Sequence, residues 1–159
     1  MTTKSDFSEE DWARIIRAPF VAGLAISLAD PGGPIEAGKE TMATMKSATN
    51  PPSREQLLAE VALEVQAMAQ ERRHPLKGYK PQAEGAAGKQ VIQELREVQA
   101  LVAATATAEE SAAYAAWLVA SAQAAAEAAK EGGFMGFRAQ QVSEGEQAML
   151  EQVREAVGA

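Results

Sequence analysis

The chain of 159 residues contains no cysteine and only one histidine. Without cysteine it has no disulfide, thiolate zinc site, iron–sulfur cluster or cysteine nucleophile. A single histidine also excludes most metal sites built from several imidazoles. Metal chemistry, if this chain has any, therefore has to rest on carboxylates.

Aromatic residues and long apolar runs are also scarce. Aromatics make up 5% of the chain, and much of the apolar content is alanine, which predicts a core of small and aliphatic side chains. The longest apolar run, 19–29, is far shorter than the roughly 20 residues that a membrane span needs. The polar, acidic N-terminus is unlike a secretory signal. These features predict a cytoplasmic protein that does not bind membranes.

Positive charge is outweighed by negative charge. Fifteen Lys and Arg stand against 22 Asp and Glu, giving a net charge of −7. A balance of this size keeps a small domain soluble and repels polyanions. General nucleic-acid binding is therefore not expected, because its affinity comes mostly from phosphate neutralisation. The partners that remain are a protein or a second copy of the chain.

What the chain has in abundance is helix signals. Ser8 is a candidate N-cap, and 53–56, 107–110 and 143–146 each have the pattern of a capping box. Pro19 predicts a kink or break at Ala18, because proline lacks a backbone donor and clashes with the preceding turn. Apolar residues recur at helical spacing in every segment. We predict an all-α, compact bundle of six or seven helices.

The segments group into one helical domain spanning 1–159. Its parts are a first half at 8–48, central helices at 53–103 with a loop at 74–88, and a second half at 107–157. A shift of 100 residues aligns 20–33 with 120–133, including both double glycines. Either alanine-rich helices align by chance here, or the chain consists of two pseudo-symmetric helix–turn–helix halves.

The duplicated pattern combines a small-residue helix, a glycine turn, an aliphatic residue and a glutamate that opens the next helix. It is carried by 29–36 with Glu40 and, less completely, by 129–133 with 142–146. This pattern resembles the TerB-like family of tellurite-resistance-associated helical domains. The resemblance implies a site for a divalent ion. Two departures weaken the match: Pro31 follows Asp30, and Lys130 stands where the family has an acid.

The first candidate site is a hard-cation site built from carboxylates, which calcium and magnesium prefer. The alternative is that acids at helix starts complement the helix dipole. The six candidate ligands are Asp30, Glu36, Glu40, Glu131, Glu144 and Glu146.

The second candidate is a basic loop in an otherwise acidic chain. It holds four cations, one histidine and one tyrosine and lacks any acid, which suits docking of a phosphate, an acidic protein or a nucleic-acid end. The alternative is a solvated loop whose arginines cap the preceding helix. The candidate partner-binding residues are Arg72, Arg73, Lys77, Tyr79 and Lys80, with His74 between them.

The third candidate is the glycine-flanked segment 132–138. Its apolar residues Phe134, Met135 and Phe137 suit a docking loop that inserts into a partner. The alternative is that the two phenylalanines fold back and close one end of the bundle.

No catalytic motif is present, neither a nucleophile elbow nor a di-iron or zinc-protease pattern. We therefore predict a non-catalytic, protein-interaction or stress-associated (TerB-like) module without an organic cofactor, with a weak divalent-cation site. One alternative is a structural homodimeric bundle. Another is an enzyme that uses paired glutamates.

Overall fold

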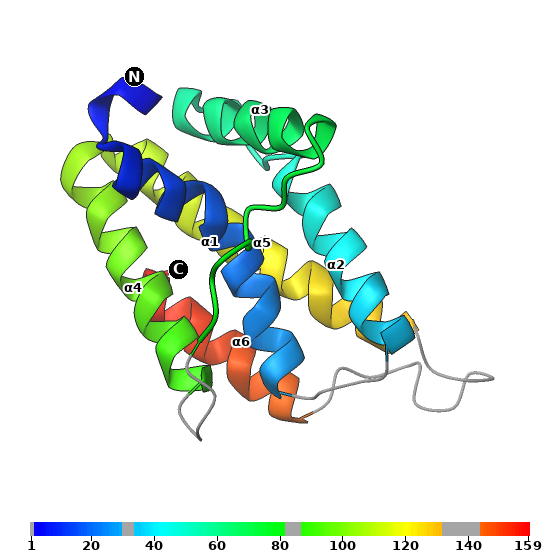
Figure 1. Ribbon diagram of the computed structural model, residues 1–159. Coiled ribbons are helices and arrows are strands. Elements are labelled where there is room, and N and C mark those ends of the chain that lie inside the picture. The colour runs from blue at the N-terminus through cyan, green and yellow to red at the C-terminus, as the bar shows by residue number, and fades with distance from the viewer. Residues whose placement is uncertain (1, 30–33, 82–86, 132–143) are drawn as a thin grey trace.

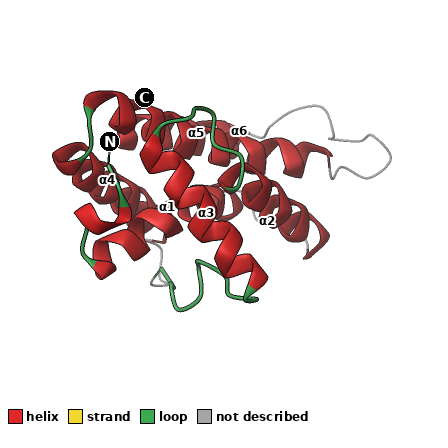
Figure 2. Cartoon of the chain, turned by 90° about the horizontal axis from the view of Figure 1, so that it is seen from above, coloured by secondary structure: helices red, strands yellow, loops and turns green. Residues whose placement is uncertain are grey.

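The computed structural model describes residues 2–29, 34–81, 87–131 and 144–159. Helices are the only regular secondary structure in these ranges (Figure 2). The prediction of an all-α bundle is confirmed, with six α-helices in the described part of the chain. The elements are η1 (Lys4–Asp6), α1 (Glu9–Ala29), α2 (Pro34–Ala48), α3 (Gln56–Gln70), α4 (Ala87–Thr105), α5 (Ala108–Glu131) and α6 (Glu144–Val157).

Helix α1 forms the centre of the bundle. It packs against α2, α4, α5 and α6, and in Figure 1 it runs between α4 and α2 with α5 behind it. Helix α3 lies across the end of the bundle near the N-terminus, where it packs on α5 and α1. The segment after α3 then crosses in front of α1 on its way to α4 (Figure 1). Helices α1 and α3, together with this segment, position the site described below.

The start of α1 follows the sequence signals. The backbone amide of Asp11 donates to the hydroxyl of Ser8 at 3.1 Å, which confirms Ser8 as the N-cap. Glu9, Glu10 and Asp11 place acidic groups in the first turn, where they complement the helix dipole.

Of the kink or break predicted at Ala18, the break is wrong. Helix α1 runs without interruption from Glu9 to Ala29, with Pro19 buried inside it. Because Pro19 has no N–H, the carbonyl of Ile15 loses its helical donor. The hydroxyl of Tyr114 donates to that carbonyl instead, at 2.7 Å. A tertiary hydrogen bond from α5 thus pairs the Ile15 carbonyl, which Pro19 leaves without a helical donor.

By length and composition alone, α1 is apolar enough to cross a membrane. Its most apolar window has a mean hydropathy of 1.4, and 61% of that window is buried inside the bundle. A core helix of a folded domain passes the same test as a membrane span. This window is longer than the uninterrupted apolar run 19–29, because Arg14 and Arg17 end the run in the sequence while the helix continues through both of them.

The capping box predicted at Ser53 is also wrong. Helix α3 has Glu55 at its N-cap, without a side-chain cap bond. The carboxylate of Glu110 accepts a hydrogen bond from the amide of Leu57 at 3.2 Å. It thus replaces the Ser53 hydroxyl as the acceptor at the start of α3. The central loop is also displaced from its predicted limits 74–88, since α3 ends at Gln70 and α4 begins at Ala87.

The start of α5 agrees better with the prediction. The amide of Glu110 donates to the Thr107 hydroxyl at 3.1 Å, so Thr107 is the N-cap. Tyr114, Trp117 and Leu118, the bulky residues of this alanine-rich helix, are each fully buried. The third capping box lies partly outside the described residues, and so do the double-glycine turns, so the two pseudo-symmetric halves stay a prediction.

Candidate functional site

A hollow of about 470 Å³ opens between α1, α3 and the segment 71–80. We call it the α1–α3 cleft. Its volume lies in the range of small-ligand and side-chain pockets. One wall is a single face of α1, whose residues recur at intervals of three and four: Glu9, Trp12, Ala13, Ile16 and Arg17.

The opposite wall comes from α3 and from the segment that follows it. Glu64 and Met68 lie one helical turn apart on α3. Beyond the helix, Arg73, His74, Pro75 and Lys77 complete the wall, and Lys4 from the N-terminal arm lies at the edge. The cleft therefore combines an apolar floor with a largely charged rim.

A tight turn at the end of α3 directs the chain toward the cleft. The amide of Arg73 donates to the carbonyl of Met68 at 2.8 Å, and the amide of Arg72 donates to Ala69 at 3.0 Å. These two bonds form a Schellman motif, in which the residue at the turn adopts the left-handed conformation. Arg72 has a φ of 58°, a conformation that normally favours glycine.

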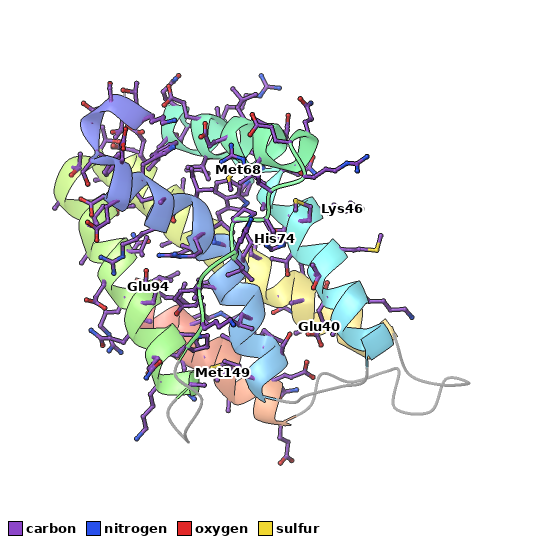
Figure 3. All side chains as sticks on the ribbon, in the orientation of Figure 1. Glu40, Lys46, Met68, His74, Glu94 and Met149 are labelled. Carbon is purple, nitrogen blue, oxygen red and sulfur yellow. The ribbon has the colours of Figure 1, made fainter. Side chains whose placement is uncertain are left out.

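His74 is fixed by the next turn. The amide of Leu76 donates to Nδ1 of His74 at 3.1 Å. The imidazole meets the ring of Phe20 edge-on, with 5.0 Å between the ring centroids. Burial lowers the pKa of His74 below its ordinary value of 6.5. With a pKa below 6.5, the single histidine is mostly neutral at pH 7. Figure 3 shows His74 on the segment that crosses in front of α1.

Arg17 is held between α4 and the segment after α3. Its guanidinium lies over the ring of Tyr79, 4.8 Å from the centroid, and its Nη2 is 3.9 Å from Glu94. Arg14 binds Glu94 more closely than Arg17 does, because its guanidinium donates two hydrogen bonds of 2.9 and 3.0 Å to the carboxylate. Burial, aided by Glu94, raises the pKa of Tyr79, so its phenol is neutral at pH 7.

Positive charge dominates the rim of the cleft. Four cations line the cleft against two acids, in a chain with a net charge of −7. Lys4 pairs with Glu64 at 3.3 Å, and Arg73 pairs with Glu71 outside the cleft. Lys77 is exposed and has no ion pair within the described ranges.

A second hollow of about 450 Å³ adjoins the cleft beneath the N-terminal arm. The two hollows share Lys4, Glu9 and Trp12. Phe7 from the arm stacks on Trp12, with 6.0 Å between the ring centroids. The shared residues make one groove, which continues past the cleft along the start of α1.

The predicted basic loop contributes only part of its residues to this site. Arg73 and Lys77 line the cleft together with His74, whereas Arg72 and Lys80 are exposed outside it. Tyr79 is half-buried beneath Arg17 and supports the site from outside. Sequence reasoning missed Trp12 and Arg17, although the helical stripe that carries both is visible in the sequence.

The predicted metal ligands are only partly described. Glu40 and Glu146 are buried, Glu144 is exposed, and Glu40 accepts a short hydrogen bond from Ser27. Among the described residues, no three potential ligands gather into a metal site. Asp30 and the side chains of Glu36 and Glu131 lie outside the described part of the chain, so the metal site stays a prediction.

The third candidate, Phe134, Met135 and Phe137, lies outside the described residues. Comparison with family models, curated proteins and solved structures finds no match to this chain. The TerB-like resemblance therefore stays a prediction, and the function has to be argued from the cleft.

Proposed function

We propose that this chain is a non-catalytic binding module that docks a peptide segment of a partner protein in the α1–α3 cleft. The observation that carries the proposal is a basic cleft with an apolar floor on an acidic domain. We expect the partner segment to be acidic. The acidic surface of the rest of the domain repels such a segment, so the basic cleft gives it one place to bind.

The floor of the cleft supplies the apolar contact that protein partners usually need. Trp12 and Ile16 on α1 face Met68 on α3, and buried Pro75 closes one side. Tryptophan and methionine are common at protein interfaces, and Met adapts to irregular partners. Trp12 and Ile16 are 3% and 5% exposed, so half-buried Met68 offers most of the apolar surface that a partner side chain would cover.

The chemistry of the cleft supports binding rather than catalysis. Its lining residues include no hydroxyl or thiol nucleophile. The one imidazole, His74, uses Nδ1 to accept the amide of Leu76, so that nitrogen does not orient or activate a nucleophile. The acids Glu9 and Glu64 lie among four cations, and Glu64 is paired with Lys4.

A peptide selection tests this proposal. Peptides are selected from a random displayed library on the wild-type domain, and the affinity of an enriched peptide is measured by fluorescence anisotropy in about 0.15 M salt. Lys77→Glu should weaken binding about tenfold or more, because it reverses a charge on the rim of the cleft.

The matched control is Lys80→Glu, which makes the same charge change in the same segment but outside the lining. It should leave the affinity within about twofold of wild type. Equal losses in both variants would show that net charge, not the cleft, attracts the peptide. Failure to enrich any peptide would contradict the proposed function itself.

A further inference from the structure

The groove that joins the two hollows changes character along its length, in the same order on both walls. On the first wall, the charged and large apolar residues follow α1 in the order Glu9, Trp12, Ile16 and Arg17. On the second wall, they follow α3 and the segment after it in the order Glu60, Glu64, Met68, Arg73 and Lys77. Each wall is thus acidic at its start, apolar in its middle and basic at its end.

Contacts between the walls bring like ends together. Lys4 pairs with Glu64 on α3 at 3.3 Å and also lines both hollows beside Glu9 of α1. At the opposite end, Arg17 lies over the ring of Tyr79, which belongs to the segment that carries the other basic lining residues. The groove therefore has one acidic end and one basic end, rather than an even mixture of the two signs.

Each end offers one exposed charge to a partner. Glu9 and Lys77 are exposed, and neither has an ion pair in the ranges that the structure describes. The other charged residues of the lining are each bonded to a neighbour within the fold: Lys4, Arg17, Glu60, Glu64 and Arg73. Half-buried Met68 provides exposed apolar surface between the two ends.

The helical register gives the distance between the two ends. Positions 9 and 17 differ by eight residues on α1, so at about 1.5 Å per residue their Cα atoms lie about 12 Å apart. An extended peptide advances about 3.3 Å per residue, so about four residues span this distance. Because alternate side chains of an extended segment point to the same side, the first, third and fifth would face the groove together.

Resting on the proposed function, we infer that the groove recognises an extended segment with an acidic and a basic side chain about four positions apart and an apolar side chain between them. The acidic side chain binds at Lys77, the apolar one covers Met68, and the basic one binds at Glu9. A segment with acids only would place a carboxylate beside Glu9, where it is repelled. Glu9 therefore determines specificity for the basic residue of the partner.

Two charge reversals at the start of α1 make a matched test. Glu9→Lys and Glu10→Lys change the net charge by the same amount, and both residues are exposed acids in the first turn of the helix. Only Glu9 lines the groove. Both variants lose a favourable interaction with the helix dipole, so a difference in binding between them arises in the groove. Circular dichroism checks that both are folded.

The peptide selection is carried out on the wild-type domain and on both variants. Peptides enriched on the wild type should carry a Lys or Arg about three to five positions from an Asp or Glu more often than the input library does. This preference for a basic residue should disappear on Glu9→Lys and persist on Glu10→Lys.

The affinity of one enriched peptide tests the pairing directly. Glu9→Lys should weaken its binding about fivefold, and Glu10→Lys should leave the affinity within about twofold of wild type. In a second peptide, glutamine replaces the basic residue. Glu9→Lys should weaken this peptide less than the first, because the charge pair is already absent.

The outcomes separate this inference from the proposed function. If the enriched peptides depend on Lys77 but lack a basic residue at this spacing, the motif with two charges is wrong and the docking of a peptide stands. The same conclusion follows if they bind Glu9→Lys and Glu10→Lys equally well. If no peptide is enriched, or none depends on Lys77, the proposed function fails and this inference fails with it.

Discussion

The hydroxyl of Tyr114 donates to the backbone carbonyl of Ile15, 2.7 Å away, one turn before Pro19. Proline cannot supply the N–H that this carbonyl would otherwise accept. The bond therefore links the two longest helices, α1 and α5, at the point where the backbone ladder of α1 is interrupted. Tyr114 is fully buried, so water cannot take its place.

The variant Tyr114→Phe should lower the free energy of unfolding by about 1–3 kcal/mol, because it leaves the carbonyl of Ile15 without this donor. In a Pro19→Ala background the cost should fall to about half or less, since alanine restores the helical donor. Urea unfolding followed by circular dichroism measures both values. Equal costs in the two backgrounds would show that the hydroxyl does not compensate for the proline.

Glu110 ties three parts of the chain together from a buried position. Its carboxylate accepts the amide and hydroxyl of Thr2 at 3.1 and 3.0 Å and the amide of Leu57 at 3.2 Å. Burial alone would raise the pKa of Glu110, but the bonds from Thr2, Leu57 and Thr107 lower it below its ordinary value of 4.5. The bond to Thr2 anchors the N-terminal arm that borders the groove.

A lowered pKa in the folded state makes stability depend on pH in one direction. The contribution of Glu110 is complete above about pH 4.5 and is lost as the pH falls through the folded-state pKa. Glu110→Gln should remove this part of the acid sensitivity and cost about 1–3 kcal/mol at pH 7. The control is its exposed neighbour, Glu109→Gln. Urea unfolding at pH 7 and pH 4 compares them, and an unchanged pH dependence in Glu110→Gln would argue against the linkage.

Gly23 allows α1 and α2 to approach closely. A β-carbon at this position would lie 2.9 Å from Cγ2 of Thr44 and closer still to its hydroxyl. Gly23→Ala should therefore destabilise the fold by about 1–3 kcal/mol. Combining it with Thr44→Ala should recover part of that loss. Gly38→Ala, at an open position on α2, should instead stabilise by up to about 1 kcal/mol. Thermal unfolding that ranks the two glycine variants in the opposite order would contradict this packing.

Arg72 adopts a left-handed conformation that costs an L-residue free energy. Arg72→Gly should raise the free energy of unfolding by about 1 kcal/mol, because glycine adopts this conformation without a steric penalty. Peptide affinity should stay the same, since Arg72 does not line the cleft. A loss of stability in urea unfolding would mean that the arginine side chain makes a contribution that outweighs the strain.

The helical fold was predictable because its signals are local. Ser8 and Thr107 cap helices as their sequence contexts indicate. The absence of a break at Pro19 and the absence of the capping box at Ser53 share one physical cause. In both places the hydrogen bond is made by a residue on α5 that is distant in the sequence. Tyr114 donates to the carbonyl that Pro19 leaves without a helical donor, and Glu110 accepts an amide at the start of α3 in place of the Ser53 hydroxyl. Such tertiary compensation leaves no mark on the local pattern.

The candidate site was predictable only in part. The cluster of positive charges in 72–80 indicated a segment that borders the cleft, since Arg73, His74 and Lys77 line it. Trp12 fits a core position on α1, and it is nearly fully buried. Its position in the wall of the cleft depends on what packs around it in three dimensions. A one-dimensional pattern shows which side chains share a face of a helix but not which of them border a hollow.

The most direct test of this account is the affinity of a selected peptide for the wild-type domain and for the variants Lys77→Glu and Lys80→Glu, measured by fluorescence anisotropy. A basic peptide-binding cleft predicts that Lys77→Glu, on its rim, weakens binding about tenfold or more, and that Lys80→Glu, outside the lining, leaves the affinity within about twofold of wild type. Equal affinities of the two variants would contradict it.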